Sequence, residues 1–259
     1  MKNIKYVLFF IVIVLLSQCN KETISPKSNT PEELYSYAKR LFDKKDYLKA
    51  KIQFSMLMIN NRAGGEIYEK CKFYLAECYY YSKEYITAIQ EYESLIKSIP
   101  QSTYREKAEY MIAMCYYKLS PHYSLDQEYT YQAIVHFQEF LEDFPGSEFR
   151  TDAEMKISQL RHKLAKKEFK KGELYRKMGR YRAAVFVYDW VLNNYYDTKF
   201  AEDALYWKSE CLKKQLRYKE AMEACKKFLE KYPDSRFANR IRKMLKDINN
   251  RLKEESNTG

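Results

Sequence analysis

Glycine and proline are scarce in this sequence: each occurs only six times in 259 residues. Sandwiches, barrels and propellers need these residues in their many tight turns, so their scarcity argues against all three architectures. The rest of the composition, 46% hydrophobic and 31% charged, is enough for a sizeable buried core and excludes long-range disorder. The composition therefore predicts an all-α chain whose helices are joined by short connections.

Groups that could form an active site are also few. The three histidines, His122, His136 and His162, have no ligand partners three or four residues away, so we expect no zinc site. The glycines form no phosphate-binding loop. We find no set of nucleophile, base and orienting residue, and acidic residues on helices are more often solvated than catalytic. We therefore expect a binding protein rather than an enzyme, with no metal and no cofactor.

Aromatic residues and positive charge are plentiful instead: 16% of the chain is aromatic and the formal net charge is +11. Such a chain could bind nucleic acid, but its beginning predicts export. Two lysines in Met1–Lys5 precede the apolar run Tyr6–Leu16, which is shorter than the roughly 20 residues of a membrane-spanning helix and typical of a secretory signal. An exported chain meets no nucleic acid, so we expect its charge to face anionic headgroups or an acidic protein.

The apolar run ends in Leu16-Ser17-Gln18-Cys19, which resembles the bacterial lipobox, although Gln18 replaces the usual small residue. The resemblance implies that residues 1–18 are a signal peptide and that Cys19 carries acyl chains, of which two already anchor a protein stably. Asn20 after the cysteine favours the outer membrane in the sorting pattern that this resembles. Residues 19–30 are then a polar tether of up to about 35 Å. An ordinary signal peptide with an incidental cysteine remains the alternative.

Five segments of the remaining chain repeat one pattern of small and large residues. The small residues of the first helices are Ala38, Ala76, Ala113, Gly172 and Ser209. The alanines of the second helices, mostly in Tyr-x-x-Ala, are Ala50, Ala88, Ala133, Ala184 and Ala221. A large residue or cysteine follows each alanine by four positions, at Phe54, Tyr92, Phe137, Tyr188 and Cys225. Over about residues 31–235 this resembles the tetratricopeptide repeat, in which small residues let paired helices approach closely.

A last helix should close the array. The apolar residues that share one face at three- and four-residue steps are Phe237, Ile241, Met244, Ile248 and Leu252. We therefore predict an α-solenoid of about five tetratricopeptide repeats with a C-terminal capping helix. Five cysteines lie in this array, and we expect buried free thiols, because Cys78, Cys115 and Cys211 occupy equivalent repeat positions too far apart for a disulfide.

First helices line the concave face of such arrays, so their aromatic residues suggest a peptide-binding groove. Position 5 of the repeat is aromatic in all five units, and position 12 changes from aromatic at Phe42, Tyr80 and Tyr117 to cationic at Arg176 and Lys213. The candidate groove residues are Tyr35, Phe42, Phe73, Tyr80, Tyr81, Tyr110 and Tyr117. Tyrosine suits this role because it joins apolar area to a polar tip. The alternative is that these aromatic residues only pack between helices.

A basic stretch runs from Arg161 to Arg182 and holds ten lysines or arginines against two glutamates. It falls on an unusually long helix that we predict over about 151–178. The candidate contacts to a protein partner or to headgroups are Arg161, Lys170, Arg176, Lys177 and Lys213. A solvated basic face is the alternative.

Three local sequences are more specific than the repeat. The third repeat carries an eight-residue insertion, residues 120–127, and is followed by Phe144-Pro145-Gly146-Ser147 and by Arg161-x-x-Leu164-Ala165-x-x-Glu168. Together with five repeats behind a lipobox, these sequences closely resemble the BamD family, the lipoprotein subunit of the outer-membrane β-barrel assembly machinery. The departures from the family pattern are Gln18 and the missing proline at position 196.

The resemblance implies a lipid-anchored scaffold on the periplasmic side of the outer membrane. Its partners would be a BamA-type insertase, through that protein's periplasmic domains, and unfolded outer-membrane proteins. The resemblance also implies a division of labour, with residues 31–148 receiving precursors and residues 149–255 holding the insertase. Two other tetratricopeptide proteins stay open: a periplasmic adaptor that coordinates cell-wall synthesis with constriction, and a glycan-capturing lipoprotein of the SusD type, which would be about twice as long.

Overall fold

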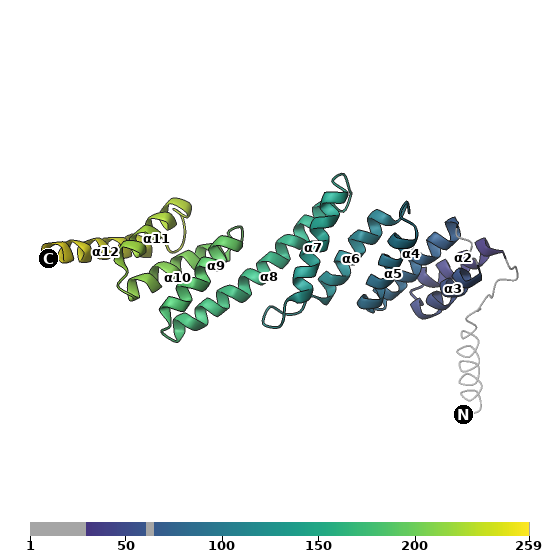
Figure 1. Ribbon diagram of the computed structural model, residues 1–259, viewed down its shortest axis with the longest axis horizontal. Helices are drawn as coiled ribbons and strands as arrows, with labels where there is room; N and C mark the ends of the chain where they lie inside the picture. The colour runs from purple at the N-terminus through teal and green to yellow at the C-terminus, as the bar shows by residue number, and fades with distance from the viewer. Residues whose placement is uncertain (1–29, 61–64, 259) are drawn as a thin grey trace, which may run out of the picture. The chain divides into compact units, whose positions relative to one another are not determined.

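The computed structural model describes residues 30–60 and 65–258, which contain helices and no strand (Figure 1). The helices are α2 (Pro31–Asp43), α3 (Tyr47–Asn60), α4 (Glu66–Tyr81), α5 (Tyr85–Ser98), α6 (Arg105–Leu119), α7 (Glu128–Asp143), α8 (Arg150–Lys177), α9 (Tyr181–Asn194), α10 (Phe200–Lys214), α11 (Tyr218–Lys231) and α12 (Ala238–Thr258). The predicted all-α fold of consecutive helix pairs is confirmed. The expected signal peptide, Cys19 and most of the tether lie outside the described residues.

These helices form two compact units that divide between Glu84 and Tyr85. The first unit contains α2, α3 and α4, and the second contains α5 to α12. The division of labour that we expect after residue 148 falls inside the second unit, where α7 packs directly against α8. That division therefore remains a prediction about function.

The small and large residues of the repeat pattern form the core of each helix pair. All five second-helix alanines are fully buried, and so are Phe54, Tyr92, Phe137 and Tyr188. Gly172 shows why the first helix needs a small residue: a Cβ at this position would lie 2.6 Å from Cε1 of Tyr188. Contact this close is possible only without a side chain, so Gly172 sets the distance between α8 and α9.

Successive pairs of the second unit are joined by a recurring pair of aromatic rings. The position-5 residue of one repeat packs against the aromatic residue that opens the next. The ring pairs are Tyr110 with Phe149, Phe169 with Phe200 and Tyr206 with Phe237, at centroid distances of 4.5, 5.3 and 4.1 Å. Because each ring covers another, these three position-5 residues of the second unit belong to the core.

Serine residues hold the opening aromatic residues in place. The Ser147 hydroxyl accepts a hydrogen bond from the Phe149 amide at 3.0 Å, and Ser235 accepts one from Phe237 at 2.9 Å. Serine is a common helix N-cap, but α8 begins after Ser147 and its N-cap is Phe149. The serines instead close the turn that precedes the helix.

Two helices of the second unit depart from the pair pattern. α8 has 28 residues and runs along α9 and α10, and its predicted length is confirmed (Figure 1). α12 packs against α11 through Ile241 and Ile248, both fully buried, as expected of a capping helix. Among the described residues, no helix is both long and apolar enough to cross a membrane.

Candidate functional site

Five partly buried or exposed rings form a continuous surface on the first unit, which we call the aromatic strip: Tyr35, Phe42, Tyr47, Tyr74 and Tyr81. Phe42 lies at the centre, with ring centroids 5.3 Å from Tyr74 and 5.7 Å from Tyr81 in edge-to-face geometry. Tyr47 stacks on Tyr81 at 5.5 Å, and Tyr35 lies 6.2 Å from Tyr74. Rings from α2, α3 and α4 therefore support one another, as favourable aromatic pairs do.

Three of the predicted groove residues lie in the strip, namely Tyr35, Phe42 and Tyr81. Tyr80 adjoins it, with its ring 5.3 Å from that of Tyr81. Phe73 is 1% exposed and is therefore a core residue that cannot contact a peptide at the surface. Sequence reasoning missed Tyr74 and Tyr47. Tyr47 belongs to the Tyr-x-x-Ala pattern, which was interpreted only as a feature of the repeat.

The other two predicted groove residues belong to the second unit and differ from each other. Tyr110 is buried under Phe149, and its hydroxyl donates a 2.5 Å hydrogen bond to Asp152. Tyr110 is thus a packing residue, because the next repeat covers it. Tyr117 is only partly buried: its hydroxyl donates to Oε1 of Gln159 at 2.6 Å, and Nζ of Lys156 lies 5.1 Å from its ring centre.

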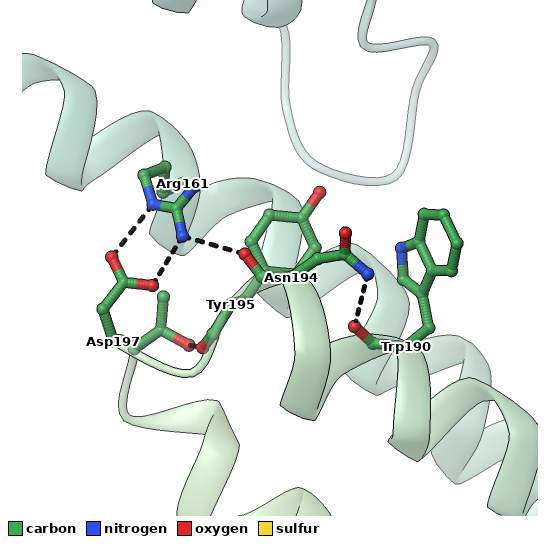
Figure 2. A network of polar contacts seen from close by, with 6 residues as sticks. Arg161, Trp190, Asn194, Tyr195 and Asp197 are labelled. Carbon is green, nitrogen blue, oxygen red and sulfur yellow. Dashed lines mark hydrogen bonds and ion pairs between the residues drawn. The ribbon is translucent and has the colours of Figure 1, made fainter.

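Arg161, which we predicted to contact a partner protein, forms hydrogen bonds to residues of its own unit instead (Figure 2). Its guanidinium donates two hydrogen bonds to the Asp197 carboxylate, at 2.7 and 2.9 Å, and a third to the Asn194 carbonyl oxygen at 2.8 Å. The pair holds the pKa of Asp197 below its ordinary value, chiefly through the hydrogen bonds from Arg161. The residue therefore fastens the turn between α9 and α10 to the middle of α8.

The other predicted cationic contacts are mostly paired as well. Nζ of Lys170 lies 2.6 Å from Oε2 of Glu173, and Nζ of Lys213 lies 2.5 Å from Oδ2 of Asp247. The Arg176 guanidinium stacks on the Trp207 ring at 3.8 Å. Lys177 is exposed and has no ion pair with any described residue. Of the five, Lys177 is thus the cation most available to a partner.

The eight-residue insertion is an ordered loop fixed to α8. The Gln127 side chain, 3% exposed, donates to the carbonyl oxygens of His122, Leu125 and Asp126 at 2.9 to 3.1 Å. Three lysines of the basic stretch hold the loop from outside: Lys163 donates to Ser120 at 2.7 Å, Lys167 donates to the Leu125 carbonyl oxygen at 2.7 Å, and Lys166 lies over Tyr123. Burial lowers the pKa of Lys163. Much of the basic stretch is therefore structural.

A hollow of about 770 Å³ lies where α8 ends and α9 begins. Its apolar residues include Tyr175, Tyr181, Phe186 and Val187, and its cations are Lys171, Arg180 and Arg182. Phe186 is 72% exposed, and Trp190, four residues further along α9, is 50% exposed. We call this surface the α8–α9 hollow. Sequence reasoning missed it, although Phe186 and Trp190 share the spacing of one helix face and alternate with the core residues Ala184 and Tyr188.

The thiols are buried, and the described part of the chain has no group of side chains placed to hold a metal. Cys71, Cys78, Cys115, Cys211 and Cys225 are all free and buried, as predicted. Burial raises the pKa of Cys71, Cys78 and Cys211 to about 12, so these thiols stay protonated at neutral pH. No group of three His, Cys, Asp or Glu side chains within residues 30–60 and 65–258 is placed to hold a metal. The arrangement suits binding through aromatic and cationic surfaces.

Two solved structures are similar to this chain at low sequence identity. The TPR2AB domain of yeast Sti1 in its pHSP90 complex is 16% identical, with a TM-score of 0.46 over 88% of this chain and 86% of that one. A TPR repeat protein of Bacteroides fragilis is 14% identical, with a TM-score of 0.44 over 86% of this chain and 99% of that one.

Comparison with known sequences gives a family. The model of YfiO, described as an outer membrane lipoprotein, matches residues 27–223, about three quarters of the chain. The outer membrane protein assembly factor BamD of Rickettsia prowazekii is 26% identical over 217 residues, which cover 84% of this chain and 86% of that protein. BamD of Caulobacter vibrioides is 26% identical over 128 residues, 49% of this chain and 42% of that protein. The chain therefore belongs to the YfiO family of outer membrane lipoproteins, together with the BamD assembly factors.

Proposed function

We propose that this protein is an outer membrane protein assembly factor, a lipoprotein held at the membrane by acyl chains on Cys19 and facing the periplasm. The observation that carries the proposal is the family match over residues 27–223. The binding surfaces on the two units support it, because an assembly factor must hold other polypeptides without transforming them.

The aromatic strip is the proposed surface for unfolded outer-membrane proteins. Its rings are preorganised by one another, so a peptide that packs on them orders few side chains on binding. Tyrosine also supplies hydroxyl groups that can bond to an extended backbone. Tyr35, Phe42, Tyr80 and Tyr81 are the residues that we expect to make these contacts, with Tyr117 as a separate contact on the second unit. Phe73 supports this surface from the core, with its ring 5.5 Å from that of Tyr74, whereas Tyr110 is a core residue of the second unit.

The α8–α9 hollow is the proposed surface for a BamA-type insertase. An exposed aromatic residue beside arginines is the composition of an interface centre, since aromatic residues and arginine are enriched there. Arg180 and Arg182 line the hollow, and Lys177 lies exposed at the end of α8, so we expect an acidic partner surface. Arg161, Lys170, Arg176 and Lys213 have partners within the second unit, so we expect them to contribute less to this contact than Lys177.

Affinity purification of the full chain from detergent-extracted membranes tests the proposal. We expect co-purification of a β-barrel insertase, and labelling of Cys19 but not of a Cys19→Ser variant when cells are grown with a radioactive fatty acid. Recovery of cell-wall synthases without an insertase would instead support the periplasmic adaptor. Measurable turnover of a small molecule by the purified protein would contradict both.

A further inference from the structure

The outward face of α3 is apolar along its whole length. The exposed residues on this face, with their exposed fractions, are Leu48 at 68%, Ile52 at 47%, Met56 at 54% and Ile59 at 59%. Steps of four, four and three residues place them on one side of the helix. The core residues on the other side are Ala50, Phe54 and Leu57. The described chain therefore covers one apolar side of α3 and leaves the second uncovered. We call the uncovered side the α3 face.

The repeat architecture does not require this composition. Counted from the buried alanine, the equivalent positions on α11 are Lys219, Glu223, Lys227 and Glu230, all of them exposed. A repeat at the end of an array usually has such a polar outer surface, which keeps it soluble. The second helices α5, α7 and α9 are apolar at no more than two of these four positions, as at Phe186 and Trp190 of α9. Among the described second helices, α3 is therefore the one that is apolar at all four, which indicates that something other than water covers this face.

Cations border one end of the α3 face. Lys44 and Lys45 lie exposed in the turn before α3, and neither forms an ion pair with a described residue. Lys49 is exposed as well, although it pairs with Asp46 at 2.9 Å. Aliphatic residues on a helix face with lysines at the border are typical of helices that lie in the interface of an anionic bilayer.

The tether limits how far the α3 face can be from a membrane. Only ten residues lie between Cys19 and Thr30, the N-cap of α2, so the chain reaches at most about 35 Å from an acyl anchor. A face held this close to a bilayer meets it at high effective concentration. α3 has 14 residues, about 21 Å of helix, which is too short to span the hydrocarbon core but long enough to lie along its surface.

We propose that the α3 face lies in the boundary between headgroups and acyl chains of the membrane that holds Cys19. Leu48, Ile52, Met56 and Ile59 enter the acyl region, and Lys44 and Lys45 contact anionic headgroups. The first unit is thereby held in one orientation by two attachments, the lipid and this helix. The inference rests on the proposed acylation of Cys19.

Tryptophan quenching by lipids tests the proposal on the complete acylated protein. Ile52→Trp places a reporter on the α3 face, and Glu223→Trp places one at the equivalent position of α11. In vesicles with one third anionic lipid and brominated acyl chains, we expect the added fluorescence of Ile52→Trp to fall at least twofold. The added fluorescence of Glu223→Trp should be unchanged. Should Ile52→Trp fail to fold, Met56→Trp reports on the same face.

Three results would overturn the proposal. The first is unquenched fluorescence at both α3 positions while Cys19 is acylated and the protein remains on the vesicles. The second is equal quenching at position 223, because the whole array would then contact lipid. The third is self-association in detergent that Ile52→Asp abolishes, because a second copy would then cover the α3 face. An unacylated Cys19 removes the premise of this inference, whereas co-purification of an insertase tests the assembly role separately.

Discussion

At the scale of single residues, the structure gives the repeat pattern a quantitative meaning. Gly172 and Tyr188 are the small and large members of the fourth helix pair, and no room remains between them for a methyl group. The buried thiols are equally constrained, since Cys71, Cys78 and Cys225 are completely covered. Substitutions at these positions should therefore change the free energy of unfolding through packing and burial, and not only through helix propensity.

Gly172→Ala should destabilise the second unit although alanine is the better helix former. Helix propensity favours the change by about 1 kcal/mol. The added Cβ, however, would lie 2.6 and 2.9 Å from two atoms of the Tyr188 ring, and overpacking of this kind costs about 1–3 kcal/mol. We expect a net loss of about 1 kcal/mol in the free energy of urea unfolding, followed by the fluorescence of Trp190 and Trp207. Lys177→Ala, an exposed change on the same helix, is the control and should have little effect. A stabilised Gly172→Ala would contradict the close contact.

Stability should fall at alkaline pH in a way that depends on Cys211. Burial raises the pKa of this thiol to about 12, whereas an unfolded cysteine titrates near 8.5. Between these values the unfolded state has lost the proton and the folded state keeps it, so the free energy of unfolding decreases as pH rises. We expect a decrease of up to about 1.4 kcal/mol per pH unit relative to Cys211→Ala. Urea unfolding of both proteins from pH 8 to 10.5 measures it. Parallel curves would show that the thiol is not buried.

At the scale of elements, the insertion between α6 and α7 is the clearest example of a loop built like a folded unit. Gln127 bonds to three carbonyl oxygens of the loop, and its own side-chain oxygen accepts from Thr130 at 2.8 Å. Lysines of α8 complete the attachment, so the loop and the basic stretch depend on each other.

Gln127→Ala should release this loop without unfolding the helices. The change leaves three carbonyl oxygens without their donor, and each lost bond of this kind costs about 1 kcal/mol. We expect hydrogen exchange of residues 120–127 to accelerate at least tenfold, while α6 and α7 stay protected. Gln138→Ala, on the exposed side of α7, is the matched control. Unchanged exchange in the loop would mean that the lysines of α8 hold it alone.

The sequence predicted those elements whose packing depends on near neighbours. The buried alanines and their partners four residues later follow from helical spacing, and so does the capping helix. Position 5 could not be assigned from the repeat alone, because the ring that buries Tyr110 belongs to the next repeat, at Phe149. The partners of the cations were also out of reach, since Asp197 lies 36 residues from Arg161. The α8–α9 hollow was missed because α9 is apolar on two sides.

At the scale of the whole molecule, the proposed function separates two tasks between the two compact units. The first unit carries the aromatic strip, and the second carries the α8–α9 hollow. If the two surfaces act independently, a change in one should leave the other intact, because separate sites give additive effects.

Paired variants test this separation. Phe42→Ala combined with Tyr81→Ala should weaken binding of an unfolded barrel-precursor peptide about tenfold, with insertase binding unchanged, because truncated aromatic contacts often cost more than 1 kcal/mol. Arg180→Glu combined with Arg182→Glu should loosen the insertase and spare the peptide. Fluorescence anisotropy with each partner measures both affinities, and circular dichroism controls for folding. The reverse assignment of the two effects would contradict the proposed division.

The ring pairs between repeats impose a direction on completion of the second unit. The rings that cover Tyr110, Phe169 and Tyr206 all lie later in the chain. During synthesis, the position-5 ring of the most recently completed repeat therefore stays exposed to solvent. It is buried only when the next repeat has been made, and the ring of that repeat is then exposed in turn. Phe237, just before α12, covers the last of these rings, that of Tyr206. A chain truncated before Phe237 would therefore leave the Tyr206 ring exposed.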